Sequence, residues 1–154
     1  LIRTAREVND NQPAYFLEFV QKRAGSLSGR QLAVLGLSYK PNIDDLRESP
    51  AIELVHLLQN AGAHVRTFEP FVPGYQVGEG ITACTSLEEA LDGAEGVFLL
   101  VAHEEFSELT GAGLFEKTGR KAGEDFFLAD AVNILKRQTS ERLNLIRLGD
   151  GRDR

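Results

Sequence analysis

The sequence predicts an α/β fold: a doubly wound parallel sheet, Rossmann-like in its three α/β/α layers, with a helical appendage at the N-terminus. Short apolar runs occur at Leu32–Leu35 and Gly96–Val101, and His64–Phe68 is predicted as a further parallel strand between them. Runs this short are typical of strands that are buried on both faces. A helical pattern of about a dozen residues separates the first two predicted strands, which implies a right-handed crossover between parallel strands.

Residues 1–24 have the apolar spacing of a helix, interrupted by Pro13. A proline in a helical pattern predicts either two helices or one sharply kinked helix. The Gly/Ser-rich residues 25–29 read as a linker. We therefore place a domain boundary there, between a helical region at 1–24 and the main domain at 25–154.

The stretch after this linker combines a strand, a polar loop and a capped helix. The first strand ends at Gly36, and the loop covers residues 38–48. Ser49 is a predicted N-cap, Pro50 suits the first helical position, and Gly62 suits the helix end. Open α/β sheets bind ligands at the carboxyl ends of their strands, so this loop is the predicted site.

The rest of the chain continues to alternate strands and helices. Residues 71–85 are rich in glycine and predict a loop with at most a short strand near Ile81. Short helices are predicted at Ser86–Leu91, which starts with a capping box, and at Phe106–Leu109. Residues 111–123 are polar and rich in glycine, and we expect them to be exposed. The remaining predictions are strands at Phe126–Ala129 and Leu143–Leu148, the latter at the sheet edge, and disorder at 149–154.

Composition limits the classes of function. The chain has 154 residues, of which 42% are hydrophobic and 26% charged, which suits one domain with its own core. Its net charge of −6 argues against nucleic acid as a partner. No apolar run reaches the roughly 18 residues of a membrane span and no signal peptide is visible, so we expect no membrane association and a cytoplasmic location. The absence of Met predicts a fragment of a longer protein.

The predicted loop carries two cations, Lys40 and Arg47, among acidic neighbours. Lys40 can reach a phosphate as a mobile ammonium, and Arg47 offers a planar fork that carboxylates can orient. Tyr39 adds a flat ring suited to a base or sugar. We interpret Asp44 and Asp45 as orienting the loop rather than as an acid/base pair.

His103 follows the carboxyl end of the third predicted strand and is followed by two glutamates. This position makes it a candidate for the site. A histidine followed by acids is, however, more typical of a solvated helix start, and that is the prediction we adopt.

The motif GLSYKPNIDDLRESPA, followed by a helix and by VRTFEP, resembles the UDP-binding C-terminal domain of the UDP-glucose/GDP-mannose dehydrogenase family. The sequence PNIDDLRESPA, followed by FEP, is most similar to the branch of the family that oxidises UDP-N-acetylmannosamine. The similarity extends from AREVND near the N-terminus to about Asn133. Members of this family oxidise sugar nucleotides to uronic acids with NAD.

The resemblance implies roles for the loop residues. Tyr39 and Lys40 would contact the UDP-sugar, and Arg47 would reach across an interdomain cleft toward NAD. The cofactor itself would be bound mainly by an N-terminal NAD-binding domain of the parent chain. Residues 1–24 would belong to a central helical region that builds a homodimer.

The resemblance also implies that the catalytic centre lies elsewhere. The family's nucleophilic cysteine lies in a glycine-rich motif that ITACTS does not match, so Cys84 is expected to be a packing residue. No residue of this chain is predicted to be catalytic or to bind a metal, and the fragment should be inactive alone. Segment 130–133 reads Asp-Ala-Val-Asn, where UDP-glucose members carry an arginine that reaches the sugar nucleotide.

Two other classes of function fit the residues alone. One is a stand-alone nucleotide-binding or regulatory module of flavodoxin-like topology, with Asp44 and Asp45 as a conceivable phosphoacceptor pair. The other is a structural piece that dimerises through the first helices. A response to UDP, to magnesium or to protein concentration would distinguish these classes.

Overall fold

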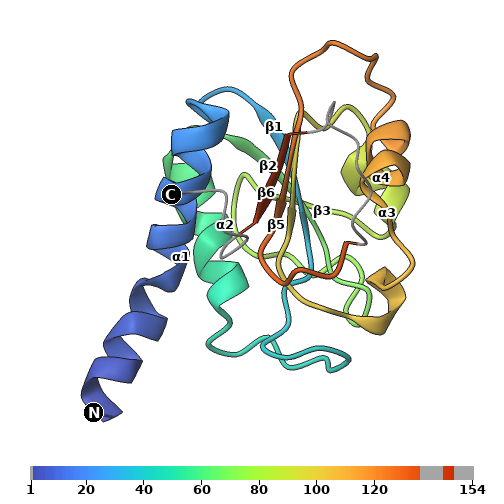
Figure 1. Ribbon diagram of the computed structural model, residues 1–154. Coiled ribbons are helices and arrows are strands. Elements are labelled where there is room, and N and C mark those ends of the chain that lie inside the picture. The colour runs from blue at the N-terminus through green and yellow to red at the C-terminus, as the bar shows by residue number, and fades with distance from the viewer. Residues whose placement is uncertain (1, 136–143, 148–154) are drawn as a thin grey trace.

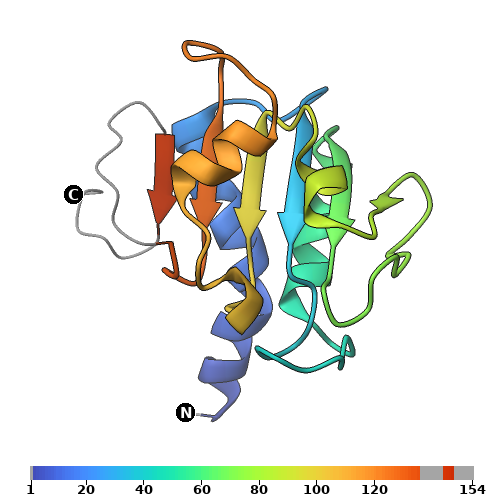
Figure 2. The same cartoon turned by 90° about the vertical axis from the view of Figure 1, so that its right-hand side faces the viewer.

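The computed structural model describes residues 2–135 and 144–147, with side chains from Gln12 onward. Its centre is a six-stranded sheet in which every neighbouring pair is parallel (Figures 1 and 2). The strands, in chain order, are β1 Gln31–Leu35, β2 His64–Phe68, β3 Thr82–Ala83, β4 Gly96–Leu99, β5 Phe127–Asp130 and β6 Asn144–Arg147. The predicted parallel α/β sheet is confirmed.

The strand order is β3-β2-β1-β4-β5-β6. It is the order of dinucleotide-binding folds, whereas flavodoxin-like sheets run 2-1-3-4-5, so the flavodoxin-like alternative is wrong in topology. The direction of winding reverses between β1 and β4, which pair from Leu32 with Gly96 to Leu35 with Leu99. A crevice at the carboxyl ends of two such strands is where ligands bind in open sheets.

Helices cover both faces of the sheet (Figure 1). One face carries α1 Ile2–Ala24 and α2 Pro50–Asn60, and the other carries α3 Leu87–Leu91 and α4 Gly111–Lys117. Successive residues of β1 therefore enter different cores. Leu32 and Val34 belong to the cluster that holds the α1 and α2 side chains, and Ala33 and Leu35 belong to the cluster under α3 and α4. This alternation explains why β1 is apolar at every position after Gln31.

The N-terminal helix α1 is continuous through Pro13, so the option of two helices is wrong. Phe16 and Val20 are buried in the α2-side core, and the Phe16 ring meets Phe98 of β4 edge-on at 6.2 Å between centroids. The C-terminal half of α1 is thus part of the domain core. Its first turns extend beyond the carboxyl edge of the sheet, on the side where the β1–α2 loop lies (Figure 2).

Two local predictions differ from the structure. Residues 111–123, expected to be exposed, contain helix α4, in which Leu114 is buried and the Thr110 side chain caps the Gly113 amide at 3.0 Å. The expected helix at Phe106–Leu109 is instead a 3-10 turn, η1, at Glu104–Phe106. Residues 143 and 148–154 of the predicted last strand and tail lie outside the described residues. Within the described part of the chain, no helix is both long and apolar enough to span a membrane.

Candidate functional site

A cavity of about 290 Å³ lies at the β1/β4 crevice. Its walls come from five parts of the chain: the loop after β1, the start of α2, the segment after β4, the segment after β5, and the middle of α1. Residues that represent these walls are Tyr39, Pro41, Pro50, Val101, Ala131 and Pro13. The cavity therefore occupies the place at which an open α/β sheet is expected to hold a ligand.

The loop begins at a glycine that no other residue can replace without strain. Gly36 has φ +93°, and a Cβ built on it would lie 2.8 Å from the Cβ of Val101. Its N–H donates to the Phe68 carbonyl at 2.9 Å. This close approach brings the ends of β1, β2 and the β4 side of the crevice together.

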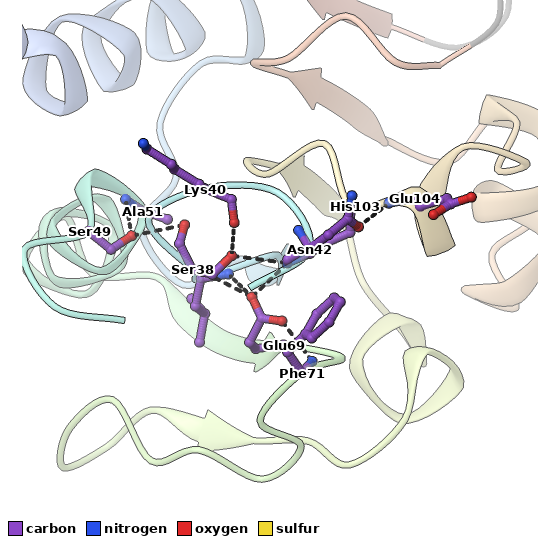
Figure 3. A network of polar contacts seen from close by, with 10 residues as sticks. Ser38, Lys40, Asn42, Ser49, Ala51, Glu69, Phe71, His103 and Glu104 are labelled. Atoms are coloured by element: carbon purple, nitrogen blue, oxygen red, sulfur yellow. Dashed lines mark hydrogen bonds and ion pairs between the residues drawn. The ribbon is translucent and has the colours of Figure 1, made fainter. Parts of the chain in front are cut away.

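Glu69, directly after β2, is the buried anchor of the loop (Figure 3). Only 1% of its surface is exposed. Its Oε1 accepts the amides of Leu37 and Ser38, each at 2.9 Å, and its Oε2 accepts the amide of Phe71 at 2.9 Å. Consecutive amides after the first strand bind pyrophosphate in dinucleotide-binding folds. Here an internal carboxylate occupies them.

His103 completes this network and is 1% exposed, so the predicted solvated helix start is wrong. Its Nδ1 accepts the Asn42 amide at 2.9 Å, and its Nε2 lies 2.8 Å from Glu69 Oε1. An N–H donor facing Nδ1 assigns the ring proton to Nε2, which donates to the carboxylate. The ring also packs against Phe71 and Phe106, with centroids at 5.0 and 5.6 Å.

Ser38, His103 and Glu69 do not form a nucleophilic triad. The Ser38 hydroxyl and the Glu69 carboxylate both approach His103 Nε2, at 3.2 and 2.8 Å, whereas a triad needs them on different ring nitrogens. The Ser38 hydroxyl also donates to the Lys40 carbonyl at 2.7 Å. The network holds the loop backbone and offers no activated nucleophile.

Tyr39 and Lys40 are presented on the outside of this anchored loop. The Tyr39 side chain lines the cavity and is 53% exposed, while its amide donates to the Asp45 carbonyl at 2.8 Å. The Lys40 ammonium lies 5.9 Å from the Tyr39 ring centroid and is outside the cavity lining. Figure 3 shows the Lys40 side chain extending away from the buried network. The structure thus places the predicted ring and cation side by side at the cavity rim.

Arg47 lies apart from the cavity, with 88% of its side chain exposed. Its Nε and Nη2 donate to the two carboxylate oxygens of Asp45 at 3.0 and 3.1 Å, and its amide donates to Asp45 Oδ1 at 3.0 Å. This hydrogen bonding lowers the pKa of Asp45 to about 2 and raises the pKa of Arg47. Asp45 orients the guanidinium, which is the role expected of the loop acids.

A buried carboxylate also binds backbone amides at the end of β5. Asp130 is fully buried, accepts the amides of Val132 and Leu135 at 3.1 and 3.0 Å, and forms an ion pair with Arg147 at 3.6 Å. Arg147 Nη2 also donates to the Leu135 carbonyl. Segment 130–133 carries no arginine, yet one reaches this end of the sheet from β6.

Cys84 is buried in the α3-side core, and burial raises the pKa of its thiol, as suits a packing residue.

Comparison with known families assigns the chain to one of them. The model of the UDP-glucose/GDP-mannose dehydrogenase family, UDP binding domain, matches residues 33–137, most of the chain. The chain belongs to this family. The match includes the whole β1–α2 loop together with Glu69 and His103.

The family relatives include UDP-N-acetyl-D-mannosamine dehydrogenase of Campylobacter jejuni. It is 40% identical over 113 residues, which cover 71% of this chain and 28% of that protein. NDP-N-acetyl-D-galactosaminuronic acid dehydrogenase of Ralstonia solanacearum is 45% identical over 111 residues, covering 71% of this chain and 26% of that protein.

Among solved structures, UDP-D-ManNAc dehydrogenase from Pyrococcus horikoshii matches 97% of this chain and 34% of its own, with a TM-score of 0.76 and 28% identity. The chain thus spans roughly a quarter to a third of the dehydrogenases it matches. It represents the UDP-binding part of an oxidoreductase family.

Proposed function

We propose that this chain is the sugar-nucleotide-binding part of an NAD-dependent dehydrogenase that oxidises a UDP-sugar to its uronic acid. One observation carries the proposal. In a chain of the UDP-binding family, an exposed aromatic ring and an ammonium lie together at the rim of a cavity at the topological switch point. These groups match the two parts of a nucleoside diphosphate.

Tyr39 and Lys40 divide the recognition of the nucleotide between them. The Tyr39 ring offers a stacking surface at a cavity whose other walls are largely proline and small apolar residues, which suits a base or ribose. Lys40 supplies a point charge that can follow the diphosphate just outside the cavity. Because Lys40 makes no ion pair within the described residues, its charge is available to a ligand.

The loop after β1 does not fit NAD as a primary ligand. Glu69 already occupies the Leu37 and Ser38 amides that would receive a pyrophosphate, and its negative charge would repel one. We therefore assign the NAD, which accepts the hydride in the parent enzyme, mainly to another domain of the parent chain. Arg47, exposed and held by Asp45, is the contact that this chain would contribute to the cofactor.

The substrate is best assigned as UDP-N-acetylmannosamine, on the strength of relatives with that name. A nucleoside-diphosphate sugar of the N-acetylgalactosamine type is the runner-up, because the Ralstonia relative is 45% identical over its matched region. The fragment should bind UDP weakly, catalyse nothing alone, and act in a cytoplasmic homodimer of the parent protein.

A nitrogen-15 NMR titration of the 154-residue chain with UDP tests this proposal. We expect the amides of Tyr39 and Lys40 to shift in a saturable manner, and Lys40→Ala to weaken binding while Lys121→Ala, at an exposed turn, leaves it unchanged. A response at Asp44 that depends on magnesium would instead favour a phosphoacceptor module. No ligand response, together with a size that changes with protein concentration, would favour a structural dimerisation piece.

A further inference from the structure

His103 contacts both ends of the loop segment that carries Tyr39 and Lys40, the two residues proposed to bind the nucleotide. On one side, its Nε2 lies 3.2 Å from the hydroxyl of Ser38, which precedes Tyr39. On the other, its Nδ1 accepts the amide of Asn42, which follows Pro41. The ring comes from the end of β4, 61 residues from Asn42 in sequence, so neither contact follows from local chain geometry. Figure 3 shows the ring between the loop and Glu69.

The two ring nitrogens serve different parts of the molecule. Nε2 donates to Glu69, whose carboxylate accepts the amides of Leu37, Ser38 and Phe71, so this contact fixes the end of β2 and the β1 end of the loop. Among the residues that the structure describes, Nδ1 accepts a hydrogen bond only from the Asn42 amide, which belongs to the loop. Asn42 has the left-handed φ of +62° and is exposed, and its side-chain Oδ1 accepts the Glu104 amide at 2.8 Å. Two hydrogen bonds thus connect Asn42 to the segment that follows β4.

We propose that His103 is a positioning residue for nucleotide binding, and that it acts through Nδ1 by fixing the Asn42 end of the Tyr39–Pro41 segment. This inference rests on the proposed function of Tyr39 and Lys40. An exposed ring and a long flexible side chain lose less freedom on binding when the backbone beneath them is already fixed. His103 provides that fixed backbone without touching the ligand.

Substituting His103 by glutamine or by asparagine distinguishes the hydrogen bond made by Nδ1 from the one made by Nε2. In His103→Gln, the longer side chain can place an N–H near the position of Nε2 and keep a donor for Glu69, but it offers no acceptor at the position of Nδ1. In His103→Asn, the shorter side chain can place its oxygen near Nδ1 and keep the acceptor for Asn42, while the donor to Glu69 is lost. His64→Gln, at the exposed start of β2, is the matched control.

The readouts are the UDP dissociation constant, the melting temperature and hydrogen exchange at the Asn42 amide. For His103→Gln we expect UDP binding about tenfold weaker and hydrogen exchange at the Asn42 amide at least tenfold faster. The reason is that the hydrogen bond from the Asn42 amide to Nδ1 is lost, and the loss of one hydrogen bond typically changes an equilibrium constant by about tenfold. For His103→Asn we expect the larger fall in melting temperature with the smaller loss of UDP affinity among the molecules that remain folded. His64→Gln should change none of the three.

Two results would overturn the inference. One is a His103→Gln chain that melts lower but binds UDP within twofold of wild type, which would make His103 a purely structural residue. The other is an Asn42 amide that exchanges as slowly in His103→Gln as in wild type. If the wild-type chain itself does not bind UDP, the proposed function fails instead, and exchange at Asn42 still decides whether His103 fixes the loop.

Discussion

Replacing Glu69 by alanine should lower the free energy of unfolding by about 3–5 kcal/mol, because it leaves several buried N–H donors without their acceptor. The structure explains why the value is large. Four N–H groups converge on this carboxylate, from the backbones of Leu37, Ser38 and Phe71 and from the His103 ring. A buried donor without a partner costs about 1–3 kcal/mol, so four of them set an upper bound of roughly 4–12 kcal/mol. Water that enters the vacated space recovers part of this loss.

Urea unfolding followed by far-UV circular dichroism measures the effect, since the chain contains no Trp for fluorescence. Glu95→Ala is the matched control, because Glu95 accepts a single exposed amide, that of Gln31, at 2.7 Å. Its loss should be about 1 kcal/mol or less. A Glu69→Ala chain that unfolds within 1 kcal/mol of wild type, with an unchanged m-value, would refute the reasoning that Glu69 anchors the loop.

Three further predictions concern the backbone and charges of the same loop. Gly36→Ala should destabilise the chain by roughly 2 kcal/mol or more in urea unfolding, because the new Cβ meets Val101 and φ is +93°. Glu48→Gly should stabilise it by about 0.5–1 kcal/mol, because Glu48 holds a φ of +54° that glycine adopts freely. Asp45 should titrate near pH 2 by carbon-13 NMR, below its ordinary value of 3.8, and Asp45→Asn should increase the mobility of the Arg47 side chain.

Each of these predictions has its own control or contrary outcome. Gly119→Ala meets open space at φ +74° and should show only the backbone part of the Gly36 effect, roughly 1 kcal/mol. A destabilised Glu48→Gly chain would mean that the left-handed residue is not strained. Because the folded pKa of Asp45 is lowered, its pairing with Arg47 is complete above pH 3.8 and is lost as the pH falls through about 2. A midpoint near 3.8 would mean that the pair does not persist in solution.

Local sequence pattern was sufficient for the central strands and for α2. The strands β1, β4 and β5 are short and largely apolar because helices cover both of their faces, so the burial of each strand is visible in its sequence. Helix α2 was predicted from Ser49 and Pro50, and the Ser49 hydroxyl does accept the Ala51 amide at 3.2 Å. Helix α4 was not predicted because Gly111 and Gly113 give its sequence a low helix propensity. The helix forms because Thr110 caps its first turn and Leu114 is buried.

The position of the β1–α2 loop at the edge of the sheet was predictable from the sequence, but the buried network that supports the loop was not. Tyr39, Lys40 and Arg47 were located from one loop at a strand end. No role was predicted for Glu69 from the sequence, and His103 was predicted to lie in solvent. Their pairing joins residues 34 positions apart in the chain, and it depends on burial that the sequence around either residue does not indicate. One signal was available. Both follow the carboxyl ends of strands that flank β1, and polar side chains at such ends converge in a parallel sheet.

The central claim is that the Tyr39–Lys40 loop binds a nucleoside diphosphate, and calorimetric titration of the 154-residue chain tests it most directly. UDP should bind measurably and more tightly than uridine, and Lys40→Ala should reduce the affinity for UDP to that for uridine, because the ammonium contacts the diphosphate. Equal affinity of wild type and Lys40→Ala for UDP, with no preference for UDP over uridine, would contradict the account.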